Sequence, residues 1–104
     1  MAEALYALEK IADAVAALAT GSGRVRDRLF EASTYLIRVR PEDIPDEDLR
    51  RTFIGVMDDD LSYAQLQGDE GRILATLRLT NDDDARAIAR RILDLHRELD
   101  RFLK

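Results

Sequence analysis

Apolar residues at the start of the chain recur at the three- and four-residue spacing of an α-helix. Between residues 2 and 19 the main stripe consists of Ala4, Leu8, Ile11, Val15 and Leu18, which is the spacing of a heptad seam. Other apolar residues widen this stripe on both sides, so the apolar arc is broader than one neighbouring helix can cover. The pattern predicts a helix over 2–19 that stops at Gly21, a residue suited to a left-handed cap.

The same periodicity is strongest near the other end of the chain. The alternation there is nearly unbroken and comprises Ala85, Ile88, Ile92, Leu95, Leu99 and Phe102. It predicts a helix that continues almost to the last residue. Thr80 and Asp83 match a capping box, in which each side chain bonds to the other residue's amide, and this places the start of the helix.

Shorter patterns fill the middle of the chain. Residues 24–39 predict a second helix, which Pro41 ends because the residue before a proline avoids helical geometry. A third helix is expected from Pro45 or Asp46 to Met57, weakened by Gly55 in its interior. Residues 58–71 read as a partly helical loop, and residues 69–79 as a short helix. The fold class predicted is therefore all-α: a compact bundle of four to five helices with short connections and long first and last helices.

Composition is consistent with this fold and narrows the compartment. A chain of 104 residues with 46% hydrophobic residues corresponds to a single domain, residues 1–104, that can build a core without disulfides. The absence of cysteine removes thiolate metal sites and cysteine nucleophiles, and it fits a reducing cytoplasm. No basic segment precedes an apolar one at the start, and no apolar run approaches the roughly 20 residues of a membrane span. We therefore expect a cytoplasmic protein, bacterial in origin, with no membrane partner.

Net charge argues against nucleic acid as a partner. The formal charge is −5, whereas binding to phosphates needs a positive surplus. Residues 24–40 are locally basic, but a recognition helix at the end of the chain would present Asp82, Asp83 and Asp84 to the phosphates. We expect the arginines of the second helix, Arg24 and Arg28 among them, to pair with acidic groups within the fold or on a protein partner.

Three acidic clusters differ in how well local structure explains them. Those at 42–48 and 82–84 lie at predicted helix starts, where the helix dipole favours negative charge. Asp58, Asp59 and Asp60 instead follow a predicted helix, and Asp69 and Glu70 come soon after with no basic residue between. The spacing fails as an EF-hand, which needs glycine at position six and glutamate at position twelve. These five residues are the predicted contact for a basic partner or a cation, and a solvated loop is the alternative.

Catalytic chemistry finds little support in the sequence. His96 is the only histidine, so it has no second histidine with which to hold zinc. No serine or threonine lies in a recognisable nucleophile turn. We expect no enzymatic activity and no cofactor.

The function predicted from these patterns is that of a non-catalytic interaction or regulatory protein. The broad apolar faces of the first and last helices predict self-association, most simply a homodimer, through either helix or both. The predicted contact residues are Leu8, Ile11, Val15 and Leu18 of the first helix. A protein partner would meet the acidic residues of 58–70 or the arginines of the second helix. The alternative is a Mg²⁺- or Mn²⁺-dependent protein or enzyme that uses the same acidic segment.

Overall fold

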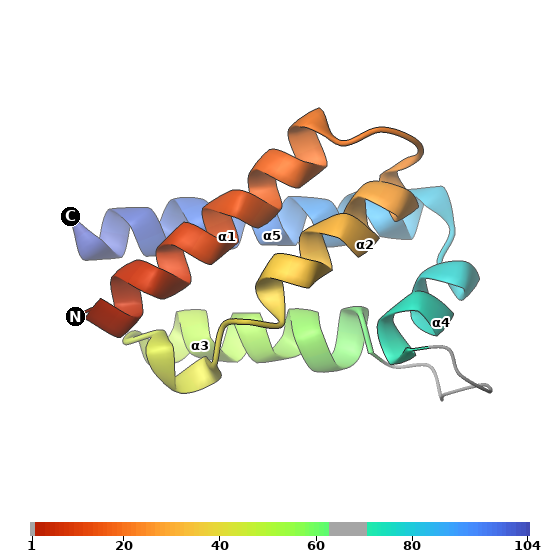
Figure 1. Cartoon of the computed structure of the whole chain (residues 1–104). Helices are drawn as coiled ribbons and strands as arrows, with labels where there is room; N and C mark the ends of the chain where they lie inside the picture. Colours follow the sequence, from red (N-terminus) through yellow and green to blue (C-terminus); the bar gives the residue numbers. More distant parts are fainter. Residues whose placement is uncertain (1, 63–70) are drawn as a thin grey trace.

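The computed structural model describes residues 2–62 and 71–104, and within that part of the chain all regular structure is helical (Figure 1). The elements are α1 (Ala2–Thr20), α2 (Val25–Leu36), η1 (Pro41–Asp43), α3 (Glu47–Ile54), η2 (Gly55–Asp60), α4 (Arg72–Leu79) and α5 (Asp82–Leu103). The predicted all-α bundle is confirmed. No described helix combines the length and the apolar character that crossing a membrane requires.

α5 is the helix against which most of the bundle is organised. α1 and α2 form an antiparallel pair on one side of it, α3 and η2 contact it from another direction, and α4 lies against α2 (Figure 1). Its inner face consists of the predicted stripe as far as Leu99, while Phe102 is exposed. One core cluster contains buried apolar residues from each of the five α-helices.

The face that α1 buries is rotated from the predicted one. Its buried residues are Ala4, Ala7, Ile11, Ala14 and Ala17, whereas Leu8, Val15 and Leu18 are only partly buried at the margin of the core. Small side chains on this face let α1 approach α2 closely, and larger ones would hold the two backbones apart. The predicted seam therefore shares Ala4 and Ile11 with the observed one, while alanines replace its larger members.

The turn between α1 and α2 relies on two glycines for different reasons. Gly23 has a φ of +88°, the left-handed region that glycine enters without strain. Gly21, predicted to fill that role, is not among the positive-φ residues of the described chain; it is needed for space, because a Cβ there would lie 2.5 Å from the Ala17 carbonyl oxygen. Arg28 then donates from Nη1 to the Leu18 carbonyl at 2.8 Å and so caps the end of α1.

The acidic stretch before α3 serves as a set of local caps, as predicted. The Asp43 carboxylate accepts from the Arg40 amide at 3.2 Å, and the Asp46 carboxylate accepts from the Leu49 amide at 3.0 Å. Asp46 is therefore the N-cap of α3. α2 ends at Leu36, earlier than predicted. The residues that follow form backbone hydrogen bonds of the i→i+3 type, and Val39 is still buried.

α3 itself ends at Ile54, before the predicted Met57, and helical structure continues through η2 to Asp60. η2 is a turn of π-helix, closed by a bond from the Leu61 amide to the Val56 carbonyl at 3.0 Å. Gly55 opens this turn, and a Cβ there would lie 3.3 Å from an Nη atom of Arg91. The glycine predicted to weaken the helix thus marks the place where an α5 side chain passes close to the α3 backbone.

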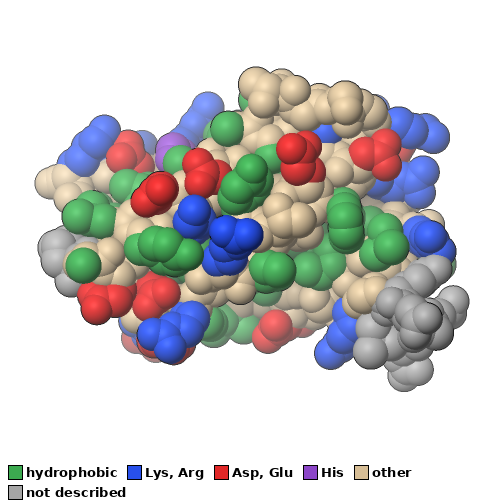
Figure 2. Space-filling view, in the orientation of Figure 1, with side chains coloured by type: hydrophobic (Ala, Val, Ile, Leu, Met, Phe, Trp, Pro, Cys, Tyr) green, Lys and Arg blue, Asp and Glu red, His purple; other side chains and the backbone are tan. Residues whose placement is uncertain are grey.

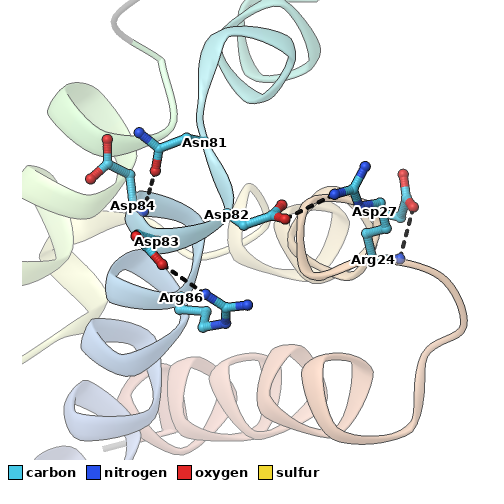
Figure 3. A network of polar contacts seen from close by, with 7 residues as sticks. All are labelled: Arg24, Asp27, Asn81, Asp82, Asp83, Asp84 and Arg86. Carbon is cyan, nitrogen blue, oxygen red and sulfur yellow. Dashed lines mark hydrogen bonds and ion pairs between the residues drawn. The ribbon is translucent and has the colours of Figure 1, made fainter.

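The N-cap of α5 lies one residue later than predicted. The Asn81 side chain accepts from the Asp84 amide at 2.8 Å (Figure 3), so Asn81 is the N-cap. Thr80 is buried and its hydroxyl donates to the Thr76 carbonyl at 2.7 Å. The predicted capping box of Thr80 and Asp83 is therefore wrong, because the Thr80 hydroxyl instead bonds to a carbonyl of α4.

Candidate interaction surfaces

The four residues predicted to mediate self-association divide into two groups. Ile11 is fully buried, so its assignment to an interface with a second chain is corrected: it is a core residue of its own chain. Leu8, Val15 and Leu18 pack against the core but keep part of their surface accessible. The accessible face of α1 therefore includes these three members of the predicted seam but not Ile11.

That face is an apolar stripe along one side of α1. It consists of exposed or half-buried residues at spacings of three and four, namely Leu5, Leu8, Ala12, Val15 and Ala19. Leu5 is 54% exposed, which leaves a large apolar side chain in water at the beginning of the stripe. We call this set of five residues the α1 stripe.

The far end of the α1 stripe opens into a groove between α1 and α5. The groove encloses about 320 Å³, and its lining is mostly apolar: Val15, Leu18 and Ala19 from α1 with Ala89 and Leu93 from α5. Arg86 and Arg90 complete the lining. We call this hollow the α1–α5 groove.

The two arginines of the groove are already neutralised on α5. Arg86 lies 2.9 Å from an oxygen of Asp83 (Figure 3), and Arg90 lies 3.4 Å from an oxygen of Asp94. Both pairs have the three- or four-residue spacing at which side chains meet on one face of a helix. The groove thus presents apolar surface edged by charge pairs, with no net positive charge from these arginines.

Both arginines predicted as partner contacts make contacts within the chain. Arg28 caps α1, as described above. The Arg24 guanidinium donates to the Asp82 carboxylate at 2.9 Å, and the Arg24 amide donates to Asp27 (Figure 3). This ion pair joins the starts of α2 and α5, two segments far apart in sequence.

Arg24 nevertheless lies at the edge of a second hollow. This hollow encloses about 370 Å³ between α2 and α4 and is lined by Arg24, Arg26, Asp27, Phe30, Leu74, Leu77 and Arg78. Apolar and basic side chains adjoin each other over this region of the surface (Figure 2). We call it the α2–α4 hollow.

The acidic residues predicted to bind a partner or a cation are only partly described. Asp58 and Asp59 are exposed on η2, while Asp69 and Glu70 lie outside the described residues. Asp60 is less exposed and forms an ion pair with Arg91 of α5. Burial raises the pKa of the Asp60 carboxyl above its ordinary value of 3.8, and the attraction of Arg91 offsets this only in part.

The described carboxylates do not gather as metal ligands would. Within 2–62 and 71–104, His, Cys, Asp and Glu side chains form no group of three or more that could hold a metal ion. Asp59, Asp60 and Asp84 do line one hollow of about 240 Å³, but Arg91 lines it with them. A guanidinium among the carboxylates supplies the positive charge that an ion would otherwise bring.

Arg26, Phe30 and Leu93 were not among the predicted contact residues. Arg26 and Phe30 lie four residues apart, a spacing that could have indicated a shared helix face, and Leu93 belongs to the apolar positions of α5 outside its strict alternation. Only the packing of α1 on α5 and of α2 on α4 shows where these residues are exposed to solvent.

No protein-family model matches this chain, and neither the curated proteins nor the solved structures compared with it include a significant match.

Proposed function

We propose that this protein is a non-catalytic interaction protein that works as a homodimer, with the α1 stripe and the α1–α5 groove as the contact between its two copies. The observation that carries the proposal is the apolar groove whose arginines are paired with carboxylates of the same helix. We also propose that it is located in the cytoplasm of a bacterium, with which the absence of cysteine is consistent.

A second copy is the occupant that fits this chemistry. A twofold interface brings the same surface from each chain together, so any net charge on it meets its own sign. Asp83 and Asp94, which lie on α5 outside the groove, offset its Arg86 and Arg90, and the remaining lining is apolar. Two such surfaces can meet without like-charge repulsion and remove apolar area from water, at roughly 25 cal/mol per Å².

The size of a stable interface explains why the groove alone is insufficient. Specific complexes bury about 800 Å² on each partner, which is more than one hollow at the end of a helix provides. The α1 stripe extends the apolar surface along the helix to Leu5. We therefore place the contact along the length of α1.

Light scattering coupled to size-exclusion chromatography tests this proposal. At about 50 µM, a concentration that populates a micromolar dimer, the wild-type chain is expected to have the mass of two copies. Ala19→Glu adds a charge to an exposed residue of the groove and is expected to weaken self-association at least about tenfold. Ala16→Glu adds the same charge to an exposed residue of α1 outside the groove, and it should leave the dimer intact.

Two results would contradict the proposal. The first is a wild-type chain that runs as a monomer at this concentration, and the second is equal behaviour of the two glutamate variants. Circular dichroism melts of both variants establish that each is folded.

The metal-dependent alternative is tested separately. Calorimetric titration with Mg²⁺ and Mn²⁺ should give no binding heat below about millimolar concentration, the weak end of carboxylate sites. A tighter site that Asp58→Asn and Asp59→Asn weaken would favour the alternative over an interaction protein.

A further inference from the structure

We propose that the α2–α4 hollow binds a short acidic peptide segment of another protein, one that inserts a large apolar side chain between Phe30 and Leu74. This inference deepens the proposed function, on which it rests, by assigning the chemistry of the partner. The α2–α4 hollow and the α1–α5 groove share no lining residue, so the two contacts can be tested independently.

The apolar part of the hollow accounts for the anchor. Phe30 is 42% exposed although it is a large aromatic residue, and it lies on the lining with Leu74 and Leu77. An aromatic or leucine side chain seated there would remove apolar surface from water on both partners, the usual source of affinity in a peptide-binding pocket. A solvent-exposed ring beside a hollow of about 370 Å³ is the feature of this surface that packing within the chain does not use.

The charged part of the hollow accounts for the acidity of the peptide. Three arginines and one aspartate, Asp27, line it. Arg24 already pairs with Asp82 and Arg78 also has an interaction within the chain, so Arg26 is the arginine whose charge is available to a ligand. Arg26 is half-buried and, among the residues that the structure describes, its side chain has no ion pair or hydrogen bond. An unpaired guanidinium that is partly withdrawn from water favours a carboxylate partner, which it can bind through two parallel hydrogen bonds.

Arg24 can contribute without giving up its own ion pair. One Nη atom donates to Asp82, and a guanidinium has five N–H donors. The bond to Asp82 also fixes the direction of the side chain, which lowers the entropy lost when a ligand binds. The ion pair with Asp82 thus orients the Arg24 guanidinium toward a ligand, whereas the ion pairs at the α1–α5 groove neutralise the charge beside an apolar surface.

A peptide fits this surface better than a nucleic acid does. Phosphate chains need a continuous track of positive charge, but the basic side chains here surround a single hollow, and Asp82, Asp83 and Asp84 follow at the start of α5. The chain as a whole carries −5, which slows the approach of any acidic partner. Affinity must therefore come from the apolar anchor together with one or two carboxylates.

A displayed library of random dodecapeptides, selected against the purified chain, is the probe for this site. The peptides enriched by the wild-type protein should contain aspartate or glutamate beside an aromatic residue or leucine. The most enriched peptide, synthesised with a fluorescein label, should bind with a Kd of about 10–100 µM by anisotropy. Arg26→Glu should weaken this binding at least about tenfold, whereas Arg97→Glu, the same change at an exposed arginine of α5, should alter it less than about twofold.

Several outcomes would overturn the assignment. They are a selection that enriches no peptide, one that enriches peptides without acidic residues, and equal effects of the two arginine variants. Sedimentation with phosphatidylglycerol vesicles is the further arm: vesicle binding that depends on Arg26, without peptide binding, would assign the hollow to lipid and refute the peptide. Light scattering on Arg26→Glu separates the two proposals, because this variant should remain a dimer even if peptide binding fails.

Discussion

At the residue scale, the start of α5 depends on one amide side chain. Asn81 accepts from the Asp84 amide, which satisfies one of the free N–H groups at the helix start. Three aspartates then occupy the first turn, where the helix dipole favours negative charge. These local interactions fix the beginning of the longest helix in the bundle.

Asn81→Ala should therefore destabilise the fold by about 1 kcal/mol, the usual cost of losing an N-cap. Asn81→Ser keeps an oxygen that can accept from the same amide and should restore most of the loss. Urea unfolding of the three proteins measures both differences. Equal stabilities of the wild type and the alanine variant would show that the cap contributes nothing.

Asp60 links stability to pH through its partly buried carboxyl. Its pKa is raised in the folded state, so the folded chain binds a proton at this group more readily than the unfolded chain. The contribution of Asp60 to stability is thus greatest below 3.8, its ordinary pKa, and falls as the pH rises through the raised folded value. Compared with the unfolded chain, the fold therefore disfavours the ionised form of this carboxyl, even beside Arg91.

Asp60→Asn, which resembles the protonated form, should be at least as stable as the wild type at pH 7. The difference between variant and wild type should shrink as the pH is lowered through the raised pKa of Asp60 toward its ordinary value of 3.8, because the protonated carboxyl then resembles the amide. Urea unfolding at both pH values measures it, with the exposed neighbour Asp59→Asn as the control for removing one negative charge. A loss above about 1 kcal/mol in Asp60→Asn at pH 7 would mean that the attraction of Arg91 outweighs desolvation.

Caps illustrate what local sequence can and cannot determine. Asp46 was among the predicted starts of α3 because the prolines and acids around it admit few alternatives, and it is the N-cap. Thr80 and Asn81 are adjacent and both suit a cap, so the choice depends on the bond between the Thr80 hydroxyl and Thr76 in the preceding helix. The left-handed residue of the α1–α2 turn is a similar case, since Gly21 and Gly23 both allow it.

At the element scale, the packing of α1 depends on small residues. Ala7 and Ala14 are fully buried, and they lie where α1 meets the rest of the bundle. A pattern of apolar spacing ranks Leu8 and Val15 above these alanines because larger side chains bury more area. Where two helices approach closely, small residues are buried instead of large ones. The buried face of α1 is therefore rotated from the predicted seam, although the helix itself was predicted at the right residues.

Ala14→Leu should destabilise the fold by about 1–3 kcal/mol, because the added side chain has no space between closely packed helices. Ala16→Leu makes the same change on the exposed side of α1 and should stay within about 0.5 kcal/mol of the wild type. Alanine and leucine both have high helix propensity, so the comparison between the two variants measures the effect of packing. Thermal and urea unfolding provide the measurement, and equal losses in the two variants would argue against a close contact at Ala14.

At the scale of the whole molecule, the bundle could be predicted but its surfaces could not. Helical periodicity places α1, α2, α3 and α5 because each spans several turns of a repeating pattern. The α1–α5 groove combines Val15 with Leu93, and the α2–α4 hollow combines Arg26 with Leu74. Such combinations depend on how helices distant in sequence pack, which a single sequence does not specify.

Pairing of charges distinguishes the two surfaces that we propose as contacts. Arg86 and Arg90 are matched on their own helix, whereas Arg26 is unmatched within the described chain. Salt should therefore have little effect on self-association and should weaken acidic-peptide binding, since screening acts on net charge. Arginine thus contributes to a neutral contact at the α1–α5 groove and to a charged contact at the α2–α4 hollow.

The Arg28 cap on α1 also has a consequence for the order in which the chain folds. Arg28 on α2 bonds to Leu18 near the end of α1, across a connection of only a few residues, so the contact closes a small loop at little entropic cost. Contacts between neighbours in sequence form sooner than those that must bring distant segments together. The first two helices can therefore associate as a hairpin while the C-terminal third of the chain is still unstructured, which leaves the inner face of that hairpin as the template on which α5 condenses.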